Sequence, residues 1–104
     1  MMEANVNEDL KLIQVFLTQG NVPGPSVYEV SQNPDNKLIC TCPGFRGRMT
    51  CKHIKFVNAR IESNNGVYPL EITYRATPED AIKAQTSNKE FREFVLRFGK
   101  IEVV

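Results

Sequence analysis

Hydrophobic residues in the first half of the chain follow the spacing of β-strands. Residues 27–31 alternate between apolar and polar positions, which is the two-residue period of a half-buried strand. The turn residues Asn-Pro-Asp-Asn at 33–36 separate them from a second predicted strand, 37–41. The prolines and glycines of residues 20–25 predict a loop ahead of these two strands. The pattern therefore predicts a β-hairpin in the middle of the chain.

Residues 10–17 form an apolar run that fits two kinds of element. Leu10, Ile13 and Leu17 have helical spacing, and Asn7 could cap such a helix. The β-branched and aromatic residues of the run, together with its modest length, favour a buried strand instead. We expect a strand and keep the helix as the alternative.

The second half of the chain contains another alternating stretch. Residues 67–75 place Tyr68, Leu70, Ile72 and Tyr74 on one face, with polar side chains between them. This pattern predicts a further half-buried strand.

Two short helices are predicted after this strand. Thr77 caps the first, which has proline at its first position and acidic residues in its first turn, and which runs to about Gln85. Ser87 begins a capping box that opens the second helix, and Gly99 ends it. The second helix carries an apolar stripe that we expect to face the core, made of Phe91, Phe94, Val95 and Phe98.

The chain ends in an apolar segment, residues 100–104, which predicts a last strand. Chain ends are normally solvated, so an apolar end needs a partner. Either it pairs inside the fold, beside residues 68–74, or it is a sheet edge that awaits another chain.

Composition indicates one small globular domain, spanning 1–104. The chain has 104 residues, of which 41% are hydrophobic and 24% charged, as is ordinary for a globular protein. Its beginning is acidic and lacks the basic start of a signal peptide, and no apolar run is long enough to cross a bilayer. We expect a cytoplasmic protein, or a nuclear one in a eukaryote; a viral or mobile-element protein acting in the host cytoplasm fits as well.

All three cysteines and the single histidine of the chain lie within fourteen consecutive positions. They form two pairs, Cys40 with Cys42 and Cys51 with His53, separated by eight residues. A loop of this length can bring four donors around one tetrahedral ion, and this set of soft ligands suits one structural Zn²⁺. The alternatives are free thiols that cluster by coincidence, and a catalytic metal, for which no general base is evident.

The spacing within each pair predicts the backbone conformation, strand or helix, at each pair of metal ligands. Side chains two residues apart share a face in an extended strand but not on a helix. Cys40 and Cys42 therefore belong at the end of a strand, whereas Cys51 belongs just ahead of a helix with His53 in its first turn. The helix would bury apolar residues at helical spacing: Ile54, Val57 and Ile61, with Phe56 beside them.

This arrangement resembles the SWIM zinc finger, whose pattern is Cys-x-Cys, a variable gap and Cys-x-His. The resemblance covers residues 27–61, about a third of the chain, and fills all four ligand positions with Cys40, Cys42, Cys51 and His53. It implies a metal-ordered ββα module that binds DNA or proteins and is not itself an enzyme.

Positive charge is concentrated on the same segment, although the net charge of the chain is only +1. Between Asp35 and Glu62 there are six basic residues and no acidic one: Lys37, Arg46, Arg48, Lys52, Lys55 and Arg60. We expect these residues to contact the phosphates of a nucleic acid. The alternative is that they balance the negative charge of a thiolate-bound zinc, or are simply solvated.

Phe45 lies between two turn glycines in the middle of the basic segment. Such a phenylalanine could stack against an unpaired base. More often it folds under its loop as a hydrophobic anchor, and this is what we expect.

The predicted fold class is α+β: a small antiparallel sheet, a zinc-stapled ββα finger at 27–61, and a C-terminal β-α-α-β extension at 66–104 packed on it. The predicted function is a zinc-stabilised accessory protein that binds DNA or RNA without sequence specificity. The alternative is a protein–protein adaptor that uses the finger or the strand at 101–104. We expect no membrane partner, no small-molecule substrate and no enzymatic activity, because the sequence has no nucleophile–base pair or phosphate-cradling loop.

Overall fold

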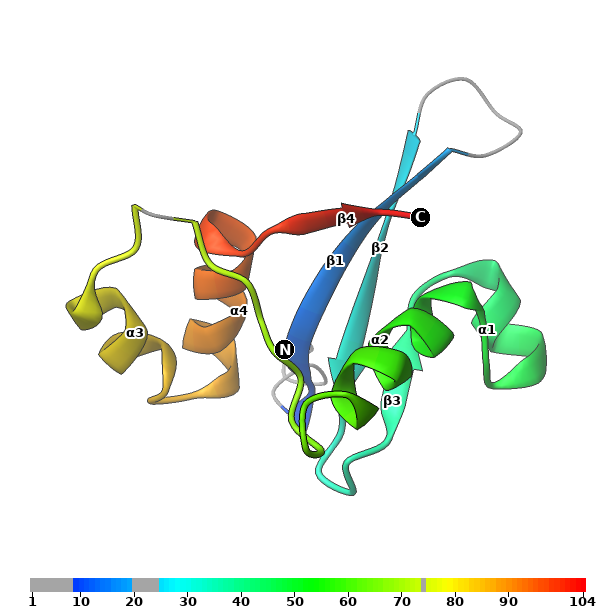
Figure 1. Ribbon diagram of the computed structural model, residues 1–104, viewed down its shortest axis with the longest axis horizontal. Coiled ribbons are helices and arrows are strands. Elements are labelled where there is room, and N and C mark those ends of the chain that lie inside the picture. Colours follow the sequence, from blue (N-terminus) through cyan, green and yellow to red (C-terminus); the bar gives the residue numbers. More distant parts are fainter. Residues whose placement is uncertain (1–8, 20–24, 74) are drawn as a thin grey trace, which may run out of the picture.

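The computed structural model of the protein describes residues 9–19, 25–73 and 75–104 (Figure 1). Most of the predicted loop at 20–25 and Tyr74 lie outside these ranges. The elements in chain order are β1 (Lys11–Gln19), β2 (Pro25–Gln32), β3 (Leu38–Cys40), α1 (Pro43–Arg48), α2 (Lys52–Glu62), α3 (Pro78–Ala84), α4 (Asn88–Phe98) and β4 (Ile101–Val103). The fold is therefore small and α+β.

The four strands form one mixed sheet in the order β3-β2-β1-β4. β2 pairs antiparallel with both β1 and β3, whereas β4 pairs parallel with β1, through Val15 opposite Ile101 and Leu17 opposite Val103. The expectation of an antiparallel sheet is therefore wrong. Parallel strands need a long connection that returns the chain to the same end of the sheet. Here α3 and α4 form the last part of that connection, between the finger and β4.

The predicted strand at 67–75 is not formed in the described part of the segment. Its only sheet contact there is an isolated bridge between Ile72 and Gly99. Pro69 has no N–H to donate to a ladder, and the side chains around it diverge. Tyr68 packs with one hydrophobic cluster and Leu70 with another. The last strand therefore pairs with β1 instead of with this segment.

The run at 10–17 is a strand, as expected, and it is buried on both faces. Phe16 belongs to one hydrophobic cluster, and its neighbour Val15 belongs to the other. An irregularity between Leu12 and Gln14 shifts the register, so Leu12 joins Val15 on its face. A central strand covered on both sides needs apolar residues at nearly every position, which is why its periodicity was ambiguous.

The two faces of the sheet are covered by different parts of the chain. α1 and α2 lie on one side and α3 and α4 on the other (Figure 1). On the first side, Phe16 and Val30 of the sheet pack with Ile54 and Val57 of α2. On the second side, the buried Val95 of α4 packs against the face of β1 that carries Val15.

Local sequence signals explain the ends of the last two helices. Thr77 and Asp80 form a reciprocal capping box at the start of α3. Ser87 accepts a hydrogen bond from the backbone N–H of Glu90 at the start of α4, and Gly99 follows its last turn. Arg92 of α4 then donates two hydrogen bonds, of 2.7 and 2.9 Å, to the carboxylate of Glu29 on β2.

None of the helices in the described ranges has the length and apolar character needed to cross a membrane.

Candidate metal centre

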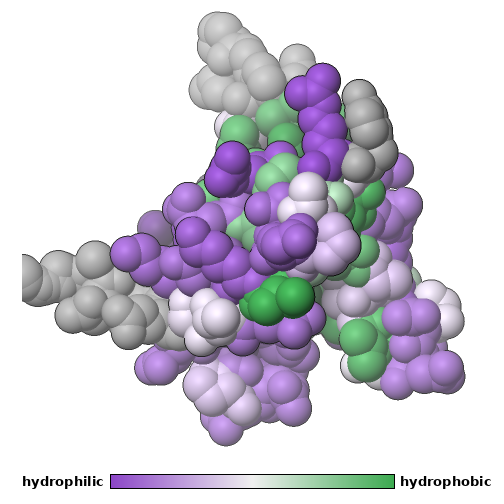
Figure 2. Space-filling view, turned by 90° about the vertical axis from the view of Figure 1, so that its left-hand side faces the viewer, coloured by the Kyte–Doolittle hydropathy of each residue, from purple (hydrophilic) through white to green (hydrophobic). Residues whose placement is uncertain are grey.

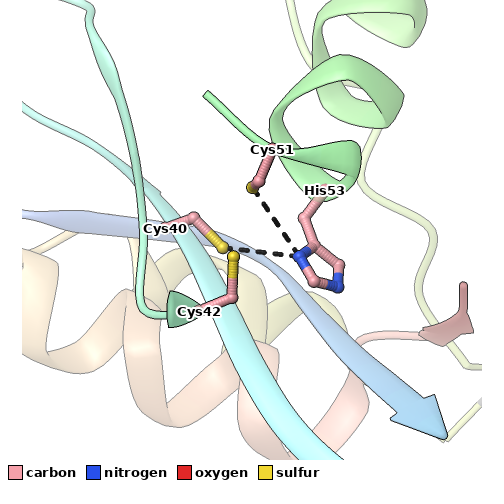
Figure 3. Close-up of side chains that lie close together, drawn as sticks. All are labelled: Cys40, Cys42, Cys51 and His53. Carbon is pink, nitrogen blue, oxygen red and sulfur yellow. Dashed lines mark hydrogen bonds between the residues drawn. The ribbon is translucent and has the colours of Figure 1, made fainter. Parts of the chain in front are cut away.

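The structure brings the four predicted ligands together at the junction of β3, α1 and α2 (Figure 3). Cys40 ends β3, Cys42 precedes α1, Cys51 is the N-cap of α2, and His53 lies in the first turn of α2. Their sulfur and imidazole nitrogen atoms all lie within 4.8 Å of one another. These four side chains could therefore hold one metal ion.

The ligand distances are close to those around a tetrahedral metal. The sulfur atoms of Cys40 and Cys51 each lie 3.7 Å from Nδ1 of His53. Zinc–sulfur and zinc–nitrogen bonds of about 2.3 and 2.0 Å in a tetrahedron place sulfur and nitrogen about 3.5 Å apart. Two sulfur atoms in such a tetrahedron are about 3.8 Å apart. The longest separation in the cluster is 4.8 Å, so its most distant pair would approach by about 1 Å around an ion.

The segment between the two ligand pairs was expected to be a loop, but it forms the short helix α1. Pro43 begins this helix, where a missing N–H costs nothing, and Met49 ends it in a left-handed conformation with φ of 60°. Phe45 is only 8% exposed and packs in the core beneath the finger. It is the hydrophobic anchor that was expected.

The second ring nitrogen of His53 is held by a residue that the sequence analysis did not identify. Nε2 of His53 lies 2.9 Å from the hydroxyl oxygen of Thr18 on β1, and both side chains are buried. With Nε2–H donating to Thr18, Nδ1 keeps its lone pair and points at the three sulfur atoms (Figure 3). The signal in the sequence is a single threonine at the end of an apolar strand.

Two aromatic rings pack against His53 on the side of the candidate centre that faces the sheet. The ring of His53 lies 4.8 Å from that of Phe16 and 5.4 Å from that of Tyr28, measured between centroids. Burial, followed by the charge of Lys52, lowers the pKa of His53, so its ring is neutral and able to bind a metal. A groove of about 470 Å³, lined in part by Cys42, Cys51 and His53, leads to the cluster from solvent.

The cysteines lie in unequal electrostatic environments. Burial raises the pKa of Cys40 to about 12, so this thiol loses its proton only if a cation takes its place. Burial also opposes ionisation of Cys42, but hydrogen bonds from Phe45, the neighbouring thiols and Gly44 lower its pKa overall. Cys51 accepts a 3.5 Å hydrogen bond from the N–H of Ile54 at the positive end of α2.

Five of the six predicted phosphate-binding residues lie exposed on the finger, and the described residues offer none of them an ion-pair partner: Lys37, Arg46, Arg48, Lys52 and Lys55. Arg60 differs from them. Its guanidinium lies 3.2 Å from Glu71 and 3.1 Å from Glu102, and it covers the ring of Phe56 at 4.5 Å. Arg60 therefore joins α2 to the C-terminal extension.

Comparisons of the chain with protein-family models, curated proteins and solved structures found no significant match. The likeness to the SWIM finger consequently remains a likeness of ligand pattern.

Proposed function

We propose that this chain is a small domain stabilised by one structural Zn²⁺, held by Cys40, Cys42, Cys51 and His53. The observation that carries this proposal is the convergence of three sulfur atoms and a neutral imidazole within 4.8 Å, with all but the half-buried Cys51 in the core. Such a donor set favours zinc over hard cations, and four protein ligands complete a tetrahedron. A centre without an open position has a structural role, so we propose binding and not catalysis as the function of the domain.

We further propose that the finger binds nucleic acid through phosphate contacts and without sequence specificity. In support, Arg46, Arg48, Lys52 and Lys55 are exposed on α1 and α2, and Lys37 is exposed on the neighbouring turn. Zinc with three thiolates carries one net negative charge, which can balance only one of these five positive charges. The excess positive charge suits the regular negative charge of a phosphate backbone.

The test is the salt dependence of binding to labelled DNA and RNA, with the zinc-loaded protein. The logarithm of affinity should fall linearly with the logarithm of salt concentration. The pair Arg46→Glu and Arg48→Glu should weaken binding to all sequences alike and reduce the slope by about 1 for each lost contact. Arg97→Glu, on the exposed surface of α4, is the matched control and should change little. Absence of binding to DNA and RNA at low salt would remove this proposal.

A second candidate function is a protein adaptor that pairs through β4. This strand lies at the edge of the sheet, and Ile101 and Val103 are 52% and 75% exposed. An exposed edge offers unpaired backbone groups to another strand. Light scattering on nuclease-treated protein tests the self-associating form of this idea. A concentration-dependent dimer that Val103→Lys abolishes would favour it, and a monomer at all concentrations would count against it.

A further inference from the structure

A second groove lies on the finger, on the other side of α1 from the metal ligands. It occupies about 450 Å³ between the turn at 33–37, strand β3 and the two finger helices. Phe45 and Ile54 form its buried floor, and Met49, which is 73% exposed, forms one wall. Its size falls within the roughly 300–1,000 Å³ typical of ligand-binding pockets.

The rim of this groove is polar and carries unused hydrogen-bonding groups. Asn36 and Asn58 line it from the turn and from α2. Both are exposed, and within the described ranges the side-chain amide of neither makes a hydrogen bond. An amide offers both donors and an acceptor, which is the combination needed at the edge of a planar heterocycle.

One uncompensated cation, Lys37, lines the groove. Arg46 and Lys55 are exposed on α1 and α2, the helices that bound the groove, and are next in sequence to the floor residues Phe45 and Ile54. The partner must therefore offer anionic charge beside a flat apolar group.

The α3 and α4 side is mainly hydrophilic with scattered hydrophobic spots (Figure 2). The groove on that side, lined by Phe94 and Phe98, differs in that its cations are accompanied by the acidic residues Asp80, Glu90 and Glu93.

We propose that this groove receives an unpaired base of a single-stranded nucleic acid, with the adjoining phosphates on Lys37, Arg46 and Lys55. The inference rests on the proposed nucleic-acid binding and adds to it the class of nucleic acid. In a duplex the faces of the bases are stacked and cannot enter a groove, whereas an unpaired base can. An apolar peptide side chain would fill the floor but would leave the amides and the cations without partners.

The experiment compares two oligonucleotides of equal length and equal charge, one carrying bases and one abasic throughout. Fluorescence anisotropy with the zinc-loaded 104-residue chain gives the affinity for each at the same salt concentration. Because a base stacked on an aromatic side chain contributes about 1–3 kcal/mol, we expect the strand with bases to bind about 5- to 150-fold more tightly. Phosphate contacts alone cannot produce this difference.

Two sets of variants locate the effect. Met49→Ala with Asn58→Ala should reduce the preference for bases to near unity, while zinc content and circular dichroism stay unchanged. Arg46→Glu should weaken binding of both oligonucleotides by the same factor. Leu96→Ala, an exposed apolar residue on α4, is the control and should alter neither affinity.

The outcomes separate the two proposals. Equal, salt-dependent binding of both oligonucleotides by the unmodified protein would overturn the base-binding groove and leave the phosphate contacts standing. No binding of either oligonucleotide would overturn both proposals. A preference for bases that survives Met49→Ala with Asn58→Ala would show that the bases bind elsewhere and would also overturn the groove.

Discussion

The two faces of the central sheet are built from different chemistry. The α2 face buries His53, Cys40 and Cys42 among its apolar side chains, whereas the α4 face buries only apolar residues in its cluster, Leu12, Val15 and Val95. Polar groups in a core are costly unless they are satisfied. The hydrophobic cluster on the α4 face is therefore complete as it stands, whereas the proposed ion would satisfy the thiol and imidazole groups on the α2 face.

The helices on the two faces also differ in what supports them. α1 has only six residues and α2 has eleven, and their N-caps are the proposed ligands Cys42 and Cys51. Isolated helices of this length are marginal in water. α4 also has eleven residues, but it is capped by Ser87 and joined to β2 by the Arg92–Glu29 pair. Metal binding should consequently control the finger far more than the extension.

The largest expected effect follows metal removal. A chelator should collapse the finger, because structural zinc contributes about 10–16 kcal/mol in finger peptides at neutral pH. Hydrogen exchange followed by mass spectrometry should show lost protection in α1 and α2 and residual protection in α4. Cys51→Ser should reproduce this pattern. Unchanged protection of α2 without metal would contradict the comparison.

A matched pair of core substitutions gives the next largest effect. Val57 of α2 and Val95 of α4 are 0% and 3% exposed, on opposite faces of the sheet. Changing either to alanine should cost about 2 kcal/mol of the free energy of unfolding, from two lost methyl groups and a cavity. Only Val57→Ala should also weaken zinc affinity, measured by competition with a chelating dye. Equal loss of zinc affinity in both variants would mean that the faces are not independent.

Removing the hydroxyl group that holds His53 should have a smaller effect. Thr18→Val keeps the shape of the side chain but leaves Nε2–H of His53 without an acceptor. Outer-sphere partners of this kind are worth about 10–100-fold in metal affinity. We expect a loss near the lower figure in the same dye competition. Thr73→Val, at an exposed position, is the control. An unaltered zinc affinity in Thr18→Val would contradict the assignment of Nδ1 as the ligand.

The smallest expected effect is on the pH dependence of stability at acid pH, through the N-terminal capping box of α3. Hydrogen bonds from the backbone and side chain of Thr77 lower the pKa of Asp80 below its ordinary value of 3.8. The cap therefore stabilises the fold above pH 3.8 and loses this contribution as pH falls through the lowered folded-state pKa. Asp80→Asn should remove this pH dependence in thermal melts of the metal-free protein, the form that exists at this pH. A pH dependence that survives Asp80→Asn would contradict the assignment of the effect to this cap.

The sequence predicted local features well because local chemistry decides them. Ligand spacing placed Cys51 ahead of a helix, and Thr77, Ser87 and Gly99 marked helix ends where the structure has them. The hydroxyl of Thr18 was missed, because its partner lies far away in the chain.

Longer-range features were not accessible in the same way. The parallel pairing of β4 depends on a crossover through α3 and α4, and nothing in residues 101–104 specifies strand direction. The alternation at 67–75 suggested a strand, but its side chains divide between two cores and Pro69 interrupts pairing. Residues 43–48 were expected to be loop, although proline at a helix start and the buried Phe45 are compatible with one turn of helix.

X-ray absorption at the zinc edge, on protein purified without added metal, is the most direct test of the account. We expect one zinc for each chain, bound by three sulfur atoms and one nitrogen at about 2.3 and 2.0 Å. A folded protein without stoichiometric zinc, or a zinc bound mainly by oxygen atoms, would contradict it.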